Sequence, residues 1–260
     1  MHRVRLECWI YAATAELGPV VTGGNAVNKV GAIVVAAGKG SRMRTAESKQ
    51  YLELAGKPIL VHTLELFERI REVDSIVLVV GEGDVSRCES YKVQYGLDKV
   101  TRIVAGGGER QDSVSLGLKA LPDDTQWVLV HDGVRPLVSE QQVLACLDKA
   151  AVTEAAVLAV PVKDTIKVVN DKGHIVSTPD RKSLWAIQTP QAFRLSLLLQ
   201  AHQMAGQDGF VGTDDAMLVE RTGVTVHVVE GDYYNIKITT PEDLPWAEWI
   251  MGSRRGDGSK

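Results

Sequence analysis

Short apolar runs alternate with amphipathic stretches along most of this chain. The runs are rich in Val and Ile and predict buried strands, at residues 30–35, 75–80, 101–104, 127–130 and 155–162. The stretches between them repeat apolar residues every three or four positions and predict helices, at residues 59–70, 85–95, 111–121 and 139–150, the last with Ser139 as N-cap. Strands and helices that alternate over short connections predict an α/β fold with a doubly wound, mostly parallel sheet.

The pattern changes after Pro161. Two short β runs, at residues 165–169 and 174–178, flank Asn170-Asp-Lys-Gly173 and predict a hairpin. Inserted into an α/β sheet, such a hairpin is expected to project as an arm over residues 162–188. Beyond it, the pattern predicts helices at 193–204 and 214–221, strands at 225–229 and 235–238, and a last helix with Pro241 at its first position.

Composition and the two ends of the chain set the domain organisation. We expect one domain, residues 29–252, that includes the arm. Residues 1–28 are expected to be a disordered extension or a misassigned start rather than a targeting segment, because Glu7 interrupts the basic start and the apolar run after it is short. The polar, Gly-rich residues 253–260 are expected to be a disordered tail.

The charge, the cysteines and the histidines narrow the class of protein. The net charge of −4 argues against a nucleic-acid or membrane-surface partner, and no apolar run reaches the length of a transmembrane helix. Three widely spaced cysteines give no disulfide framework, so we expect a cytoplasmic setting. Six scattered histidines show no zinc-ligand spacing.

The segment after the first strand is the first candidate site. Ala36-Ala37-Gly38-Lys-Gly40 has small side chains, which let a backbone approach a ligand and form an anion-binding concavity. From Ala36 to Lys57 there are five cationic and two acidic residues, a local balance of +3 in a chain of net charge −4. Phosphates are the expected ligand. Neither G-x-x-x-x-G-K-S/T nor G-x-G-x-x-G is present, so a Walker ATPase and a Rossmann dehydrogenase are not supported.

Two further motifs fall at the carboxyl ends of predicted strands, where such sheets bind ligands. Gly106-Gly-Gly-Glu-Arg-Gln-Asp-Ser113 opens a helix; it is either a capped turn or a second nucleotide-binding loop at a helix N-terminus. His131-Asp132-Gly-Val-Arg135 closes the fourth strand. Asp132 either caps the next turn or, beside a triphosphate loop, ligates Mg²⁺, which favours one or two carboxylates plus substrate phosphates.

These segments together resemble one family. AAGKGSRM with SKQYLEL, GGGERQDS, HDGVRP, GTDD and EGDYYNIKITTPED follow the order of the 2-C-methyl-D-erythritol 4-phosphate cytidylyltransferases, from about residue 29 to 250. Three positions depart from the family pattern: Ser48 where proline is usual, Gly108 where an acid is common, and Gly133 where alanine is usual. The family has a GT-A-like nucleotidyltransferase fold, so the resemblance implies that fold here.

The resemblance also implies a reaction and its residues. CTP and 2-C-methyl-D-erythritol 4-phosphate would give 4-diphosphocytidyl-2-C-methyl-D-erythritol and pyrophosphate, in the non-mevalonate isoprenoid pathway, with Mg²⁺ held by Asp132. The implied catalytic cations are Arg42, Lys49 and Lys237. The implied nucleotide contacts are Ala36, Ala37, Gly38, Lys49, Gly107, Ser113 and Asp132. The implied contacts to the second substrate are Asp132, Arg135, Thr165, Arg181, Thr213 and Lys237, with Thr165 and Arg181 delivered by the partner subunit of a homodimer formed through the arm.

Two other functions remain open on the sequence. A ribitol 5-phosphate cytidylyltransferase shares the nucleotide chemistry, although its loop typically begins Ala-Gly-Gly rather than Ala-Ala-Gly. A non-catalytic nucleotide sensor on the same fold would not need Arg42, Lys49, Asp132 and Lys237 together.

Overall fold

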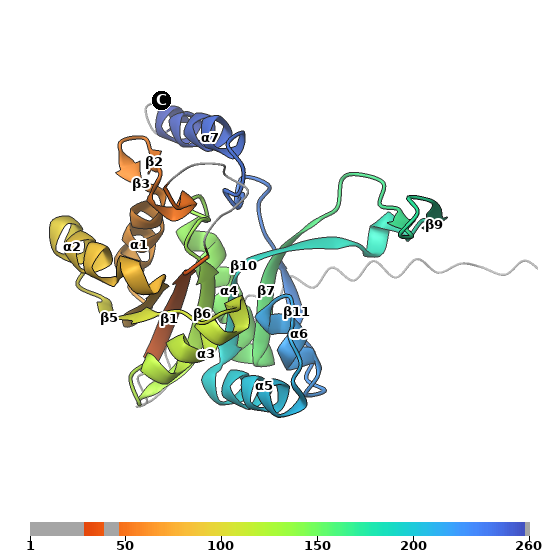
Figure 1. Cartoon of the computed structure of the whole chain (residues 1–260), viewed down its shortest axis with the longest axis horizontal. Coiled ribbons are helices and arrows are strands. Elements are labelled where there is room, and N and C mark those ends of the chain that lie inside the picture. The colour runs from red at the N-terminus through yellow and green to blue at the C-terminus, as the bar shows by residue number, and fades with distance from the viewer. Residues whose placement is uncertain (1–28, 39–46, 258–260) are drawn as a thin grey trace, which may run out of the picture.

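A seven-stranded sheet with helices on both faces forms the body of the protein (Figure 1). The computed structural model describes residues 29–38 and 47–257. The strand order is β11-β7-β10-β6-β1-β4-β5, and all pairs are parallel except those of β10, which runs antiparallel to β6 and β7. The strands are β1 Lys29–Ala36, β4 Ser75–Val80, β5 Val100–Ala105, β6 Thr125–Asp132, β7 Ala155–Pro161, β10 Trp185–Arg194 and β11 His227–Glu230. The predicted α/β fold class is confirmed.

The helices cover the sheet in two layers. One face carries α1 Ile59–Arg69, α2 Val85–Tyr95 and α4 Glu140–Thr153, and the other carries α3 Arg110–Ala120, α5 Leu195–Asp208 and α6 Asp215–Glu220. The period-2 alternation of strand side chains separates the two cores: Ala32 and Val34 of β1 face one, and Ile33 faces the other. β4 is buried along its whole length, which explains why its sequence is continuously apolar.

The register brings the carboxyl ends of the central strands to one edge. Ala36 at the end of β1 pairs with Val80 of β4, and Val35 pairs with Asp132 of β6. The loops that follow β1, β5 and β6 therefore meet above this edge, where α/β sheets bind ligands. The three motifs that the sequence placed at strand ends thus lie close together.

A small third layer lies beyond this edge. It comprises the two-residue strands β2 Glu53–Leu54 and β3 Lys57–Pro58 and helix α7 Asp243–Asp257. Leu54, Ile59, Ile238 and Ile250 are buried together in its core. This layer anchors both the Lys49 segment and the Lys237 segment next to the edge.

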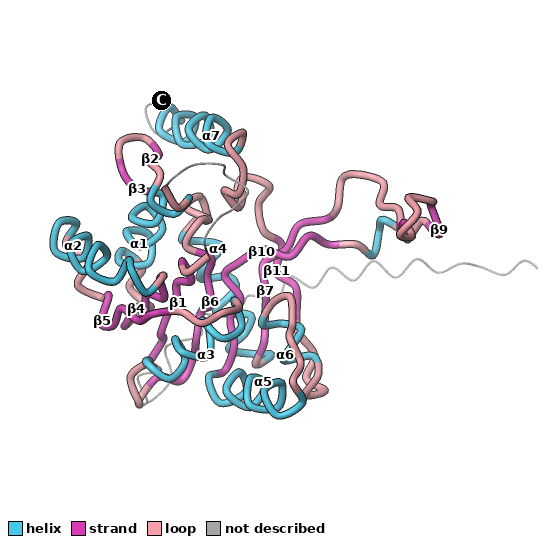
Figure 2. Tube along the Cα trace, in the orientation of Figure 1, coloured by secondary structure: helices cyan, strands magenta, loops and turns pink. Residues whose placement is uncertain are grey.

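The arm projects from the body of the molecule (Figures 1 and 2). Its strands, β8 Val168–Val169 and β9 Ile175–Ser177, pair antiparallel in a sheet of their own, and the short helix η4 Arg181–Ser183 follows. The apolar side chains of the hairpin and its flank are 39% to 63% exposed: Ile166, Val168, Val169, Ile175 and Val176.

The prediction and the structure differ in several elements. The first hairpin strand, predicted at 165–169, is confined to Val168–Val169. Strand β10 is missing from the prediction, which begins a helix at residue 193; α5 begins at Leu195. Pro190 and polar neighbours argue against a strand in sequence, but a register shift between Ile187 and Gln191 accommodates them. Residues 235–238 form no strand, because the Ile238 amide bonds to the Val134 carbonyl in a loop outside the sheet.

The last helix also differs from the prediction at its start. It begins at Asp243, two positions after Pro241, and it extends through 253–257, part of the segment expected to be a tail. The Asp243 carboxylate accepts the amide hydrogens of Thr239 and Thr240, which fixes the turn that leads into the helix. No helix of the described part of the chain is long and apolar enough to cross a membrane.

Candidate active site

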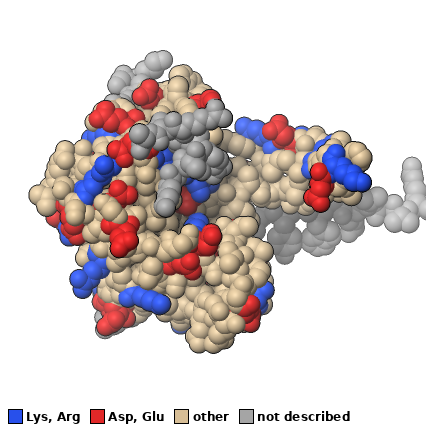
Figure 3. Space-filling view, viewed as in Figure 1, with Lys and Arg blue, Asp and Glu red and all other residues tan. Residues whose placement is uncertain are grey.

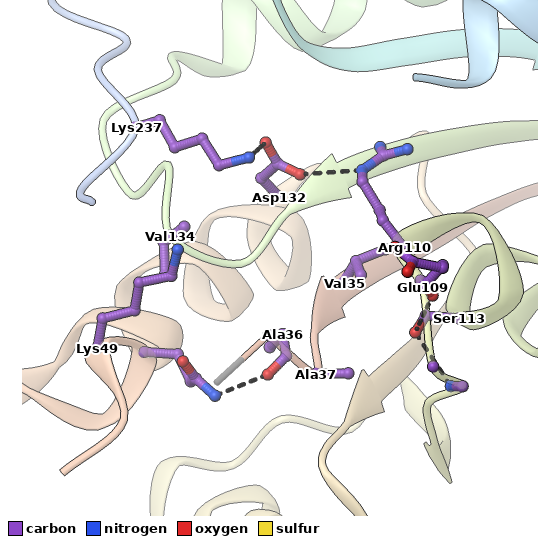
Figure 4. A pocket seen from close by; sticks show the side chains of 14 residues that line it. Val35, Ala36, Ala37, Lys49, Glu109, Arg110, Ser113, Asp132, Val134 and Lys237 are labelled. Carbon is purple, nitrogen blue, oxygen red and sulfur yellow. Dashed lines mark hydrogen bonds and ion pairs between the residues drawn. The ribbon is translucent and has the colours of Figure 1, made fainter. Parts of the chain in front are cut away.

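A pocket of about 190 Å³ opens at the carboxyl edge of β1 and β6 (Figure 4). The end of β1 and the residues after it, Val35 to Gly38, line one side, and Lys49 and Gln50 line the next. The turn between β5 and α3 supplies Gly107, Gly108, Glu109, Arg110 and Ser113, and Asp132, Val134 and Lys237 complete the wall. The pocket thus collects residues from five separate segments of the chain.

The β1 end is fixed by its neighbours. A Cβ on Gly106 would lie 2.5 Å from Ala37 Cβ and 2.7 Å from Ser113 Oγ, so only glycine lets the β5–α3 turn pack this closely on the loop. Gln50 Nε2 donates to the Ala36 carbonyl at 2.8 Å and is buried. This bond anchors the 3₁₀ turn η2 Lys49–Tyr51 and places the Lys49 side chain at the pocket wall.

The N-terminus of α3 faces the pocket. Ser113 Oγ accepts the Gly107 amide hydrogen and donates to the Glu109 carbonyl, both at 3.1 Å, and so ties the glycine turn to the helix. The Glu109 amide donates to Asp112 Oδ2 at 3.1 Å. The positive end of the helix dipole and the exposed turn favour an anion in the pocket.

Three cations surround the Asp132 carboxylate. Lys237 Nζ lies 2.9 Å from Oδ2, Arg135 Nε lies 3.5 Å from Oδ2, and Arg110 Nε lies 3.5 Å from Oδ1. Figure 4 shows Lys237 and Arg110 reaching Asp132 from opposite sides. Burial alone would raise the pKa of Asp132, but Lys237, Arg110 and Arg135 outweigh it and hold the pKa well below its usual range. The carboxylate is therefore ionised at neutral pH.

A hydrogen-bonded chain fixes the backbone on either side of Asp132. The Asp132 amide donates to Thr189 Oγ1 at 3.0 Å, and Thr189 Oγ1 lies 3.1 Å from His131 Nδ1. His131 Nε2 lies 3.2 Å from the Arg135 carbonyl. Burial lowers the pKa of His131 to about 4. A neutral imidazole has one acceptor and one donor, so Nδ1 accepts from Thr189 and Nε2 donates to Arg135.

A second pocket adjoins the first. Arg110, Asp132 and Lys237 line both, and Arg135, Thr189 and Thr213 are among the other residues of the second. Arg135 is held there by its Nη1, which donates to the Asn235 carbonyl at 2.8 Å. Burial lowers the pKa of Arg135, although Asp132 opposes this. Two pockets with cationic side chains in their walls therefore meet at the Asp132 cluster, an arrangement suited to bringing two phosphates together.

Most residues expected at the site lie at these pockets. The first is lined by Ala36, Ala37, Gly38, Lys49, Gly107, Ser113, Asp132 and Lys237, and the second adds Arg135 and Thr213. Arg42 lies outside the described residues. Thr165 and Arg181 lie in the arm and line neither pocket; Arg181 Nη1 donates to the Lys163 carbonyl at 2.8 Å. Within one chain the structure does not bring these two residues to the site.

Sequence reasoning missed Arg110, Gln50 and Thr189. The position of Arg110, after a glycine run and at the first turn of a helix, is the signal that could have found it. Gln50 and Thr189 carry no such signal, because their roles depend on contacts with β1 and β6.

The residues at Asp132 fit a magnesium ion only together with substrate. Among the described residues, no three His, Cys, Asp or Glu side chains form a metal-binding group. Three cations at Asp132 oppose a metal ion, so this single carboxylate could serve Mg²⁺ only when phosphate oxygens supply most of the ligands.

Fold and site define a transferase that acts on nucleotide phosphates, and comparisons with known proteins give the family. The model of the family described as 2-C-methyl-D-erythritol 4-phosphate cytidylyltransferase matches residues 30–253. Proteins of that name from Alkaliphilus metalliredigens and Halalkalibacterium halodurans are 49% and 50% identical, over 90% and 85% of this chain and 97% and 96% of their own.

Solved structures agree. The 4-diphosphocytidyl-2C-methyl-D-erythritol synthase from Anaerococcus prevotii has a TM-score of 0.77 at 35% identity, covering 87% of this chain and 97% of that one. The 2-C-methyl-D-erythritol 4-phosphate cytidylyltransferase from Francisella tularensis has a TM-score of 0.74 at 32% identity, covering 85% and 99%. This chain belongs to the 2-C-methyl-D-erythritol 4-phosphate cytidylyltransferase family, as its motifs predicted.

Proposed function

We propose that this protein transfers a cytidylyl group from CTP to 2-C-methyl-D-erythritol 4-phosphate, releasing pyrophosphate and forming 4-diphosphocytidyl-2-C-methyl-D-erythritol for isoprenoid synthesis. The family membership and one structural observation support this. Two pockets share Arg110, Asp132 and Lys237, so two phosphate substrates bound side by side would meet at this cluster. The first pocket suits the nucleotide, because it has the glycine turns and the helix N-terminus.

The reaction needs charge stabilisation more than a base. A phosphomonoester has a second pKa of about 6, so the attacking oxygen is already ionised at neutral pH. That oxygen bonds to the α-phosphorus of CTP while the bond to the β-phosphate oxygen breaks, and pyrophosphate leaves with its electron pair. Two unit charges about 4 Å apart repel by roughly 4 kcal/mol at an effective dielectric of 20. Lys49, Lys237 and Arg42 are the cations proposed to offset this repulsion.

Each substrate has its proposed contacts. The backbone of Ala36 to Gly38, with Gly107 and Ser113, would hold the cytidine end of the nucleotide. Arg135 and Thr213 would bind the erythritol phosphate from the second pocket. Asp132 would hold Mg²⁺ together with the triphosphate, and the ion would neutralise phosphate charge. Because the cluster around Asp132 has a net positive charge in the free protein, the ion is expected to arrive with the nucleotide.

A homodimer completes the proposal. The apolar side chains of the arm are exposed in the single chain, and an isolated two-stranded hairpin is marginally stable in water. A twin arm would cover them through an isologous contact, and Thr165 and Arg181 would then serve the partner's second pocket.

On the face drawn in Figure 3, acidic and basic side chains are interspersed over the described surface. With the net charge of −4, this supports a protein without nucleic-acid or membrane partners, and the free thiols of Cys88 and Cys146 support a reducing, cytoplasmic setting.

Pyrophosphate release tests the proposed reaction. CTP and Mg²⁺ are incubated with the protein and either 2-C-methyl-D-erythritol 4-phosphate or ribitol 5-phosphate, and the cytidylyl product is identified by mass spectrometry. We expect release with the erythritol phosphate only. Release with ribitol 5-phosphate alone would assign the other cytidylyltransferase activity. CTP binding without pyrophosphate release from either mixture would indicate a nucleotide sensor.

A further inference from the structure

Arg110 lies at the boundary between the two pockets and contacts two carboxylates. Its Nη1 lies 2.7 Å from Asp215 Oδ2, and its Nε lies 3.5 Å from Asp132 Oδ1. The side chain is 27% exposed and lines both pockets. The shorter contact is to Asp215, so this carboxylate, rather than Asp132, holds the guanidinium.

Asp215 is buried behind the pockets. It is the first residue of α6, and 1% of its side chain is exposed. His202 Nε2 of α5 donates to its Oδ1 at 3.1 Å, and Arg110 donates to its Oδ2, so both carboxylate oxygens have partners. Burial would raise the pKa of Asp215, but Arg110 and His202 outweigh it and lower the pKa. Asp215 is therefore a fixed negative charge that lines neither pocket.

The two carboxylates compete for one guanidinium. If Asp132 were its only partner, a flexible arginine could form the bidentate pair that arginine and carboxylate prefer. That pair would turn the guanidinium away from incoming phosphates. Asp215 holds Nη1 instead, which leaves Nε at 3.5 Å from Asp132 and keeps the partly exposed Arg110 side chain at the boundary of the two pockets.

We propose that Asp215, supported by His202, is a positioning residue that orients Arg110 toward the phosphates at the boundary of the two pockets. This inference rests on the proposed function, because the boundary is where the attacking phosphate meets the α-phosphate of CTP. Arg110 acts as a catalytic cation there, and Asp215 acts through it. A preorganised donor loses little freedom when the transition state forms.

A double-mutant cycle on kcat tests whether Asp215 acts through Arg110. Asp215→Asn keeps the shape and removes the charge, and Arg110→Met removes the guanidinium. We expect Asp215→Asn to lower kcat by at least about 10-fold, and by less than about 3-fold when Arg110→Met is already present. Equal losses in both backgrounds would overturn the proposal, because a purely structural role does not depend on Arg110.

The experiment has a matched control, and a second variant replaces Asp215→Asn if that variant does not fold. Asp208→Asn removes a surface carboxylate at the end of α5, which is also paired with an arginine, Arg221 at 2.6 Å. In this variant kcat should change by less than about 2-fold. If Asp215→Asn does not fold, His202→Leu removes the donor to Oδ1 and enters the same cycle. Loss of kcat that is the same with and without Arg110 would then contradict the proposal.

A crystal structure of Asp215→Asn separates this inference from the proposed function. We expect α5 and α6 to be unchanged and the Arg110 guanidinium to move onto Asp132. If Arg110 keeps its place, Asp215 does not position it, whatever the wild-type protein catalyses. If Arg110 moves but the wild-type protein releases no pyrophosphate, the proposed reaction fails and the positioning of Arg110 by Asp215 stands.

Discussion

Asp132 keeps its negative charge because three nearby cations compensate for its burial. The carboxylate in turn reduces the repulsion among these three cations. Lys237 lies 2.9 Å away, and Arg110 and Arg135 lie at 3.5 Å. Without the carboxylate, three positive groups would repel one another at the meeting point of the two pockets. Removal of one partner from a buried charged cluster is costly, because the remaining charges stay buried.

The first prediction concerns this carboxylate. Asp132→Asn keeps the size of the side chain and removes its charge, so we expect kcat/KM to fall by at least about 10²-fold and the dependence on Mg²⁺ to weaken. The measurement is the initial rate of pyrophosphate release over a Mg²⁺ titration. Asp124→Asn, an exposed acid before β6, is the control. An unchanged Mg²⁺ curve in Asp132→Asn would mean that another group holds the metal.

The second prediction concerns the neutral His131. Its pKa in the folded protein is about 4, below the roughly 6.5 of the unfolded chain. Between these values the unfolded state binds more protons, so stability falls as the pH drops through this window, by about 2 kcal/mol between pH 7 and pH 5. Urea unfolding at both pH values should show this loss in the wild-type protein and a smaller one in His131→Asn. The exposed His174→Asn should behave as wild type; equal losses in all three proteins would contradict the assignment.

Single residues at strand ends could be predicted from the sequence, but their supporting partners could not. The glycine turns and Asp132 follow apolar runs, and a parallel sheet brings such positions to one edge. Arg110 donates to the Asp215 carboxylate, 105 positions away in the sequence, and the Asp132 amide donates to Thr189, 57 positions away. Such contacts depend on how α6 and β10 pack, and β10 itself has no clear strand pattern because Pro190 interrupts it.

At the scale of elements, a glycine in helix α3, Gly117, lets the helix pack closely against the sheet. A Cβ on Gly117 would lie 2.7 Å from Ile33 Cγ2 of β1 and 3.1 Å from Val79 Cγ2 of β4. The absence of a side chain therefore sets how closely α3 approaches the two strands. Because α3 begins at Arg110, this packing also sets where the helix N-terminus meets the pocket.

The third prediction separates this packing from helix propensity. Gly117→Ala should destabilise the protein by about 1–3 kcal/mol, because the added methyl group forces Ile33 or the helix to shift. Gly206→Ala is the control: Gly206 lies in α5, and nothing lies within 4 Å of its added Cβ. That change should stabilise by roughly 0.5–1 kcal/mol. Denaturant unfolding measures both; stabilisation by Gly117→Ala would show that α3 is not closely packed.

At the scale of the whole molecule, the arm is the feature that one chain does not explain. It carries exposed apolar side chains, and Thr165 and Arg181 on it line neither of the two pockets at the Asp132 cluster of their own chain. The base of the arm is firmly tied to the body. Lys163 Nζ lies 3.4 Å from the centre of the Tyr233 ring, and the Tyr233 hydroxyl donates to the Pro161 carbonyl at 2.8 Å. A fixed base and an uncovered tip are suited to presenting residues to a second copy.

The fourth prediction tests shared sites by mixing inactive chains. An Arg181→Ala chain keeps Lys49, and a Lys49→Ala chain keeps Arg181; each should lose at least about 10²-fold in kcat as a homodimer. In a mixed dimer, the intact body of one chain faces the intact arm of the other, so one of its two sites works. Statistical mixing gives about half mixed dimers, and therefore about a quarter of wild-type activity.

The control for this experiment combines two residues of one pocket. Lys49 and Lys237 line the same pocket of the same chain, so mixing Lys49→Ala with Lys237→Ala should restore nothing. Native mass spectrometry establishes that subunits exchange in both mixtures. Recovery in the first mixture and none in the second would show that Arg181 serves the neighbouring pocket. If exchange occurs and neither mixture recovers, Arg181 acts within its own chain or outside the reaction, and the arm then joins two independent sites.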